Sequence, residues 1–286
     1  MAEARARTPA AMVLLDRDPP KASHARAMAE RLVVRNGLVE VGDTLVGEAL
    51  YLALSVAWTA EADDRHEGTI TAHAQSPDGA LPSPSLQGVL DGLLDGGGSR
   101  VPAHLAPLVA PEASSWLTAR AEVLIEEAVA PVREGVARRH ARDHERIIEY
   151  FTTLVTEARA PRRRIDAAAV EARVAQFVGE RDAKLGALAP RFTLRVSSAP
   201  AGLLGAVVPV VRVKLRLRRR KESREVAVTL PSGASALDAP LCEGCLGGAP
   251  RPALCDDRLH LLCERCAPHA QGRVACPACA RGAAKR

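Results

Sequence analysis

The residues best suited to chemistry are seven cysteines and one histidine near the C-terminal end of the chain. They form the series Cys242-x2-Cys245-x9-Cys255-x4-His260-x2-Cys263-x2-Cys266-x9-Cys276-x2-Cys279, which uses every cysteine present. Zn²⁺ prefers four nitrogen or sulfur ligands in a tetrahedron, and a Cys-x2-Cys turn presents two thiolates from one tight loop. Eight such ligands make two closed sites, so the sequence predicts two Zn²⁺ per chain.

Other roles for these cysteines fit less well. Disulfide pairing leaves one of the seven cysteines over, and a bridge inside a Cys-x2-Cys turn is strained. A thioredoxin-like redox motif belongs near a βαβ unit, whereas these pairs lie in a stretch rich in Gly and Pro. Catalytic zinc keeps one coordination position open, and this set divides evenly into fours. Structural zinc is therefore the favoured role.

The ligand order and the Cys276-Pro277-Ala278-Cys279 ending resemble the RING finger family. That family carries three cysteines, one histidine and four more cysteines around two interleaved zinc ions. The resemblance implies that one ion is bound by Cys242, Cys245, Cys263 and Cys266, and the other by Cys255, His260, Cys276 and Cys279. Two sequential zinc ribbons, divided between His260 and Cys263, are the alternative, and the spacing does not decide between them.

RING proteins of the ubiquitin pathway place a bulky aliphatic residue just before the second cysteine and often a basic residue right after the last. This chain has Gly244 and Ala280 at those positions. The resemblance therefore implies a RING-like or treble-clef interaction module. A RING-type ligase for a ubiquitin-like modifier is the alternative.

Signatures of other enzymes are missing from the sequence. A phosphate-binding loop needs GxxxxGK[ST], and the nearest approach, Gly42-x4-Gly47-Glu48-Ala49, would turn an acidic residue toward the phosphates. No GxSxG, HExxH or kinase signature occurs either. We expect no catalysis from this chain alone.

A basic segment between Arg212 and Arg224 holds six Arg and two Lys against one Glu. Strict alternation from Val211 to Arg218 places its basic residues on one face of a strand. A solvated outer face is the simpler interpretation, and phosphate contact is the alternative. Because only 2% of residues are aromatic, nucleic-acid binding here would be tolerant of sequence. The candidate contacts are Arg212, Lys214, Arg216, Arg218, Arg219, Arg220 and Lys221.

The sequence patterns around these groups predict an α+β fold. The chain has 286 residues, and its hydrophobic content of 47% is enough for a globular core. Residues 1–98 read as a small α+β unit, with a hairpin formed by Leu45 to Ala57 and Thr69 to Ala74, and a helix from Pro84 to Leu94. Residues 112–190 read as a long helical hairpin with coiled-coil-like spacing. Residues 191–232 read as an antiparallel β segment. Pro231 to Pro240 reads as a linker to the RING-like module of residues 241–286.

The order of these elements from Ala22 to Leu230, with Arg35-Asn36-Gly37-Leu38 near its start, resembles the C-terminal accessory region of bacterial RNA-polymerase-associated Swi/Snf-type ATPases. The ATPase lobes of that family are absent. The resemblance implies a bacterial chain that works with a separately encoded Swi/Snf-type ATPase or docks on RNA polymerase.

Segments for export or membrane insertion are not expected. The apolar run Ala10 to Leu15 is shorter than a signal-peptide core, and the stretch Ala201 to Val211 contains Pro209 and is too short to span a bilayer. We therefore expect a cytoplasmic protein without membrane contact. The sequence favours a non-enzymatic zinc-binding adaptor for a helicase-type ATPase or transcription machinery, with the ligase and a nucleic-acid-binding protein as alternatives.

Overall fold

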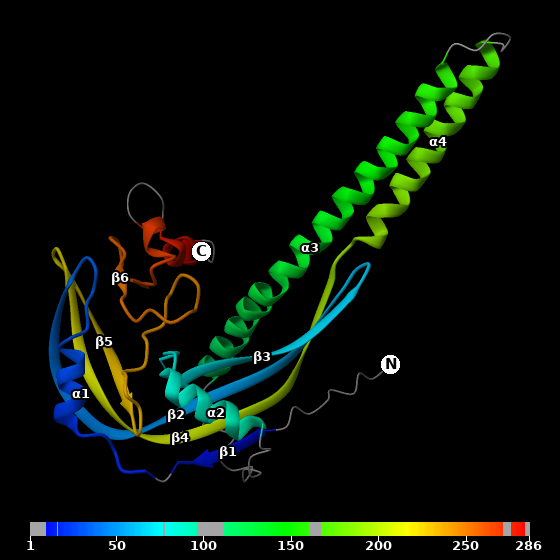
Figure 1. The fold of residues 1–286 in the computed structure, drawn as a ribbon. Coiled ribbons are helices and arrows are strands. Elements are labelled where there is room, and N and C mark those ends of the chain that lie inside the picture. The colour runs from blue at the N-terminus through cyan, green and yellow to red at the C-terminus, as the bar shows by residue number, and fades with distance from the viewer. Residues whose placement is uncertain are drawn as a thin grey trace. The chain divides into compact units, whose positions relative to one another are not determined.

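The computed structural model describes residues 10–15, 17–76, 78–95, 111–160, 167–270 and 276–283. The chain is α+β, which confirms the predicted fold class: helices accompany a mixed five-stranded sheet and a small two-stranded one (Figure 1). The five-stranded sheet contains β1 (Ala10–Leu14), β2 (Leu38–Glu61), β3 (Arg65–Ser76), β4 (Arg195–Arg219) and β5 (Glu222–Pro231). The small sheet contains β6 (Ala253–Leu254) and β7 (Leu261–Leu262).

Strand order in the large sheet is β1-β4-β2-β3, and β5 pairs with β4. β1 runs parallel to β4, with Ala10 opposite Leu203, whereas β5 runs antiparallel, from Val210 opposite Pro231 to Arg219 opposite Glu222. β1 and β5 thus pair with different stretches of the long strand β4. The sheet joins strands that lie before the helical hairpin in the sequence to strands that lie after it.

The helices are α1 (Ala22–Ala29), α2 (Pro84–Asp95), α3 (Pro111–Arg159), α4 (Ala167–Arg191) and α5 (Pro277–Ala283), with a 3₁₀ turn, η2, at Ala267–Ala270. α3 continues through Pro131. Among the helices of the described ranges, none is both long and apolar enough to cross a membrane.

The alternation predicted for the basic strand is confirmed. Val211, Val213, Leu215 and Leu217 are buried on one face of β4, while Lys214, Arg216 and Arg218 on the other face are exposed. The hairpin to β5 turns at Arg220, whose φ of 54° is left-handed. Apolar burial on one face therefore sets the register of this strand.

Two compact units make up the chain. The first contains residues 1–57, 69–124 and 199–286, and the second contains residues 58–68 and 125–198. One core of the first unit lies where Leu86 and Leu90 of α2 pack on Tyr51 of β2 and Leu204 of β4. A second core joins α1 to the buried face of β4 and β5.

The second unit is built on the predicted helical hairpin, in which α3 and α4 run side by side (Figure 1). Its core contains Val136, Leu188 and Phe192. Arg139 of α3 donates two hydrogen bonds, of 2.6 and 2.7 Å, to the carboxylate of Asp63 in the turn between β2 and β3. These contacts fasten the helices to the strand turn of the same unit.

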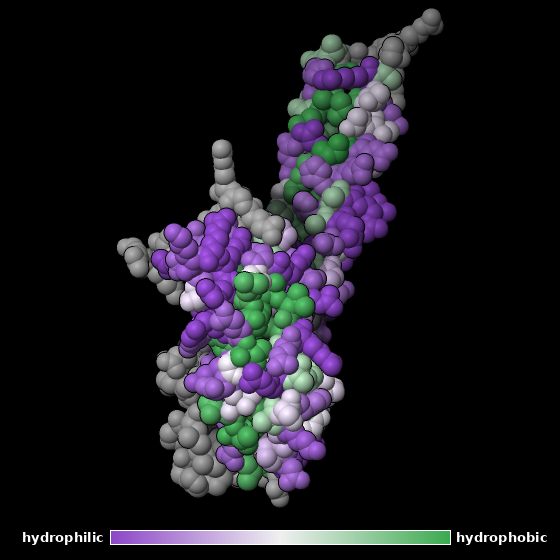
Figure 2. All heavy atoms as spheres, turned by 90° about the vertical axis from the view of Figure 1, so that its left-hand side faces the viewer, coloured by the Kyte–Doolittle hydropathy of each residue, from purple (hydrophilic) through white to green (hydrophobic). Residues whose placement is uncertain are grey.

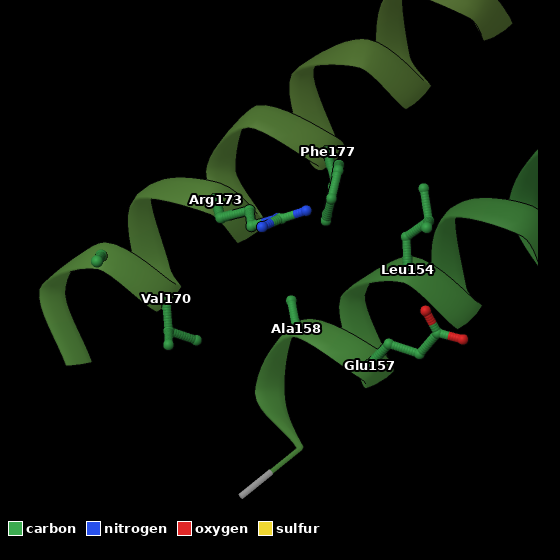
Figure 3. A pocket seen from close by; sticks show the side chains of 7 residues that line it. Leu154, Glu157, Ala158, Val170, Arg173 and Phe177 are labelled. Carbon is green, nitrogen blue, oxygen red and sulfur yellow. The ribbon is translucent and has the colours of Figure 1, made fainter. Parts of the chain in front are cut away.

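A small pocket of about 190 Å³ lies farther along the hairpin (Figure 3). Val170 and Phe177 of α4 line it opposite Leu154 and Ala158 of α3, with the guanidinium of Arg173 beside the Phe177 ring at 5.5 Å. Five of its seven lining residues are apolar, and all seven come from these two helices. The pocket is therefore a gap in the packing of the hairpin.

The linker predicted from Pro231 to Pro240 is instead packed into the first unit. Asp238 is 2% exposed, and its carboxylate accepts hydrogen bonds from the Tyr51 hydroxyl at 2.5 Å and from the Ser83 N–H at 3.0 Å. Ala239 pairs with Leu81 as an antiparallel bridge. Burial raises the pKa of Asp238 from 3.8 to about 7. Small polar residues misled the prediction because their partners lie more than 150 residues away in the chain.

Candidate metal centre

The structure gathers the eight predicted ligands into two groups of four, which confirms the predicted pair of zinc-compatible clusters. Within each group the ligand atoms all lie within 4.8 Å of one another. We call the first group the all-cysteine cluster and the second the histidine cluster. Their ligands interleave along the chain, so the sequential alternative is not the arrangement found. The groups are Cys242, Cys245, Cys263 and Cys266, and Cys255, His260, Cys276 and Cys279.

A short hairpin explains the interleaving. Cys255 directly follows β6 and His260 directly precedes β7, and the Cys255 N–H donates to the His260 carbonyl at 3.1 Å. Cys263 directly follows β7 and joins the other cluster. The turn inside the hairpin needs a left-handed residue, which is Leu259 with φ 52°. A hairpin of two-residue strands thus separates the ligands of two metal ions.

The separations within the clusters fit a tetrahedral zinc ion. Bonds of about 2.3 Å to sulfur and about 2.0 Å to nitrogen place two sulfurs about 3.8 Å apart, and a sulfur and a nitrogen about 3.5 Å apart. The Sγ atoms of Cys245 and Cys263 are 3.6 Å apart. His260 Nδ1 lies 3.5, 3.8 and 3.3 Å from the Sγ atoms of Cys255, Cys276 and Cys279. Both donor sets therefore suit Zn²⁺, and Nδ1 is the histidine atom that would bind it.

Backbone N–H groups point at the sulfurs, as thiolate ligands require. Cys263 N–H donates to Cys242 Sγ at 3.2 Å, and the N–H groups of His260 and Arg258 donate to Cys255 Sγ at 3.3 and 3.5 Å. A donor directed at an anion favours the charged form. The folded backbone thus supports the deprotonated cysteines that zinc needs.

Thiol pKa values show the cost of crowding these groups. Burial and then repulsion from Cys242 raise the pKa of Cys266, and burial and then repulsion from Cys255 raise that of Cys279 to about 12. Burial also opposes ionisation of Cys263, but hydrogen bonds led by the Cys266 N–H lower its pKa to about 7. Zinc binding displaces the remaining protons, so the metal and proton loss are coupled.

Glu243 connects the two clusters and was missed by sequence analysis. It lies inside the first Cys-x2-Cys turn, yet its Oε2 is 3.6 Å from Nε2 of His260 in the other cluster. Its Oε1 accepts from Arg224 Nη1 at 2.5 Å and from the Leu261 N–H at 3.1 Å. A carboxylate behind a ligating imidazole orients the ring. Nothing in the sequence marked this role, because an acidic residue between two ligand cysteines faces no particular partner until the chain folds.

The metal centre is built into the first unit, because Leu254, Leu259 and Leu261 belong to the core formed by α1, β4 and β5. Asn36 forms a two-way contact with Leu254, whose carbonyl accepts from Asn36 Nδ2 at 2.9 Å and whose N–H donates to Asn36 Oδ1 at 2.7 Å. The same carbonyl accepts from Arg219 Nη1 at 2.6 Å. The Asn36 amide thus pairs with the outer edge of β6 as a neighbouring strand would.

The basic residues of β4 meet carboxylates at several points. Arg216 pairs with Glu225 at 3.0 Å, and Arg218 with Glu40 at 2.8 Å. Arg219 pairs with Asp256 at the metal centre. Lys214, Arg220 and Lys221 are exposed, and Arg212 is half-buried. The structure therefore places the seven candidate phosphate contacts along one strand and its turn, with three of them paired to acids.

A cleft of about 520 Å³ adjoins the all-cysteine cluster and is lined by three arginines, Arg120, Arg251 and Arg265. Arg120 Nη1 donates to the Leu246 carbonyl in the turn after Cys245 at 2.5 Å. Four thiolates around one Zn²⁺ carry a net charge of about −2. The arginines reduce the electrostatic cost of that charge near the folded core. Figure 2 shows purple, hydrophilic side chains gathered around smaller green, apolar areas on one face of the molecule.

No protein-family model, no curated protein and no solved structure matches this chain. The zinc assignment therefore rests on the ligand geometry.

Proposed function

We propose that this chain is a zinc-stabilised adaptor whose RING-like module serves protein binding and not catalysis. The observation that carries the proposal is the completeness of the donor sets: each cluster supplies four protein ligands within 4.8 Å. Zinc held by four protein ligands has no open position for a substrate. Such an ion stabilises the fold of the module, and the surface of the module then serves to bind a protein.

Gly244 favours an adaptor over a ligase. RING-type ligases carry a bulky aliphatic residue just before their second zinc-binding cysteine, which is the Gly244 position here. A Cβ atom at Gly244 would lie 2.9 Å from Cys266 Sγ and 3.3 Å from a Leu262 methyl group. Real Cβ atoms essentially never approach other atoms as closely as the first of these distances, so this backbone has no room for the aliphatic side chain. The ligase alternative therefore lacks one of its expected contacts.

The partner we propose is a Swi/Snf-type ATPase or RNA polymerase, in a bacterial cytoplasm. The order of elements from Ala22 to Leu230, which resembles the accessory region of such ATPases, supports this choice. Nucleic-acid binding through β4 has weaker support, because Arg216, Arg218 and Arg219 each pair with a carboxylate.

Affinity capture of the tagged full chain from its native extract, with nuclease present, tests the proposal. Recovery of RNA polymerase subunits or a Swi/Snf-type ATPase is the expected result. A matched capture with Tyr150→Asp, which alters a 57% exposed side chain on α3, tests whether the hairpin is the docking element. Discharge of a ubiquitin-like modifier from its conjugating enzyme by the purified chain would contradict the adaptor proposal and favour the ligase.

A further inference from the structure

The outer edge of β5 is open for strand pairing along part of its length. β5 pairs with β4 alone among the described strands. In an antiparallel ladder, the backbone N–H and C=O of alternate residues point to opposite sides. The Thr229 carbonyl accepts from the Asp238 N–H, so Thr229 faces away from β4. By the same alternation, Ala227 and Glu225 also face away from β4.

Two further contacts agree with this assignment. The Ser232 N–H donates to the Pro209 carbonyl, which turns even-numbered residues toward β4. The hairpin closes with Arg219 opposite Glu222, as a two-residue turn requires. Within the described parts of the chain, no backbone hydrogen bond occupies the outward N–H and C=O groups of Ala227 and Glu225.

A groove runs beside this open edge. Its volume is about 250 Å³, and four consecutive residues of β5, numbers 224–227, form one wall. Trp116 of α3 and Leu241 line it as well, and the left-handed turn at Gly79, with φ +68°, holds its backbone against both of these side chains. The remaining lining residues are Asp78, Ala80, Pro240, Glu243 and Leu261. An aromatic and aliphatic wall opposite an open strand edge is the setting in which an extended peptide adds to a sheet.

Charged residues around the groove determine which charge is favoured on a bound segment. Three of the four charged lining residues are acidic: Asp78, Glu225 and Glu243, against Arg224. Glu243 pairs with Arg224 at 2.5 Å and Glu225 pairs with Arg216 at 3.0 Å, so exposed Asp78 is the acid placed to attract a basic group. A basic side chain on the incoming strand is therefore favoured over an acidic one.

We propose that the outer edge of β5 receives an extended segment of a partner protein, which pairs with the backbone of Glu225 and Ala227, places an apolar side chain against Trp116 and Leu241, and carries a basic residue near Asp78. This edge already accepts the chain's own segment at Thr229, so the partner would continue an existing pairing. The inference deepens the proposed adaptor function and rests on it, since it names the chemistry of one partner segment.

A synthetic peptide, Lys-Thr-Val-Thr-Val-Thr-Val, is a suitable probe because it is extended, apolar on alternate positions and basic at one end. The zinc-loaded full chain carrying Trp58→Phe leaves Trp116 as its single tryptophan, so fluorescence reports on the groove. Saturable binding is expected. N-methylation of alternate peptide residues should abolish it, because methylated amides cannot pair with the strand edge. Replacing the Lys by Glu should weaken it.

Ala227→Pro is the decisive protein variant. Proline removes an N–H that points away from β4, so it leaves the β4–β5 ladder intact and is tolerated on an edge strand. Loss of this donor is expected to weaken peptide binding about tenfold. Ala227→Val keeps the N–H and should bind like the parent chain. Two bound zinc ions and an unchanged far-ultraviolet circular dichroism spectrum verify folding of each variant.

Equal binding by Ala227→Pro, or no saturable binding of the unmodified peptide, would overturn the inference. Self-association of the chain that Ala227→Pro abolishes, measured by sedimentation, would assign the edge to a second copy and would overturn it as well. None of these results bears on capture of the partner through another surface, so the adaptor proposal stands or falls separately.

Discussion

Asn36 connects the sheet to the metal centre, and its removal should loosen zinc. Asn36→Ala deletes both hydrogen bonds to Leu254, of 2.9 and 2.7 Å. The Leu254 carbonyl keeps its hydrogen bond from Arg219. The Leu254 N–H loses Asn36 as its acceptor, and Leu254 is only 1% exposed. Neutral hydrogen bonds contribute about 1 kcal/mol each, so we expect a loss of about 2 kcal/mol.

This loss has a kinetic consequence at the histidine cluster. Leu254 directly precedes the ligand Cys255, so opening of the β6–β7 hairpin exposes the cluster to competitors. If Asn36→Ala lowers the free energy of opening this hairpin by the same ~2 kcal/mol, zinc transfer to a chromogenic chelator should be about 30-fold faster. Urea unfolding followed by Trp116 fluorescence, in the Trp58→Phe background, measures the equilibrium change in the first unit.

Glu40→Gln is the matched control, because it breaks an exposed ion pair between β2 and β4, with Arg218, without touching the metal centre. Surface pairs are typically worth less than about 1 kcal/mol, and zinc release should not change. If Asn36→Ala releases zinc at the parental rate and unfolds at the parental urea concentration, the metal centre is not held by the sheet and the reasoning fails.

Three further predictions concern the clusters and the buried charges. Cys245→Ser and Cys279→Ser should each lower the zinc content from two ions to one, as measured by inductively coupled plasma mass spectrometry, whereas a variant that loses both ions would contradict separate clusters. Asp238 has a folded-state pKa of about 7 against 3.8, so the folded state binds more protons and stability falls as pH rises from about 4 to 7. Between pH 5 and 8 the parent should lose on the order of 2 kcal/mol relative to Asp238→Asn, and parallel pH profiles would refute this. Arg139→Ala removes two bonds from α3 to Asp63, which lower the pKa of that carboxyl. Amide exchange in the β2–β3 turn should therefore quicken, and the stability that ionised Asp63 confers above its unfolded pKa should disappear.

Residue spacing alone predicted much of this protein. The Cys/His series predicted the two zinc-compatible clusters that the structure forms, because zinc chemistry restricts both donor type and spacing. The alternation of β4 identified its buried face, and the apolar stripes of residues 112–190 identified the helical hairpin. These are local patterns, set by the period of a strand or helix and by the bite of a Cys-x2-Cys turn.

Tertiary structure decided how these parts join. Pairing of β4 with β1 and β2, burial of Asp238 beneath Tyr51, and the Asn36 contact to Leu254 each bring together residues far apart in the chain. The division of ligands between the two clusters belongs here too, because it depends on the β6–β7 hairpin. A sequence pattern reports which face of an element is apolar, whereas the identity of the covering element depends on packing of the whole chain. The sequence therefore determined the metal chemistry of this protein, and only the fold decided that the metal centre shares a core with the sheet.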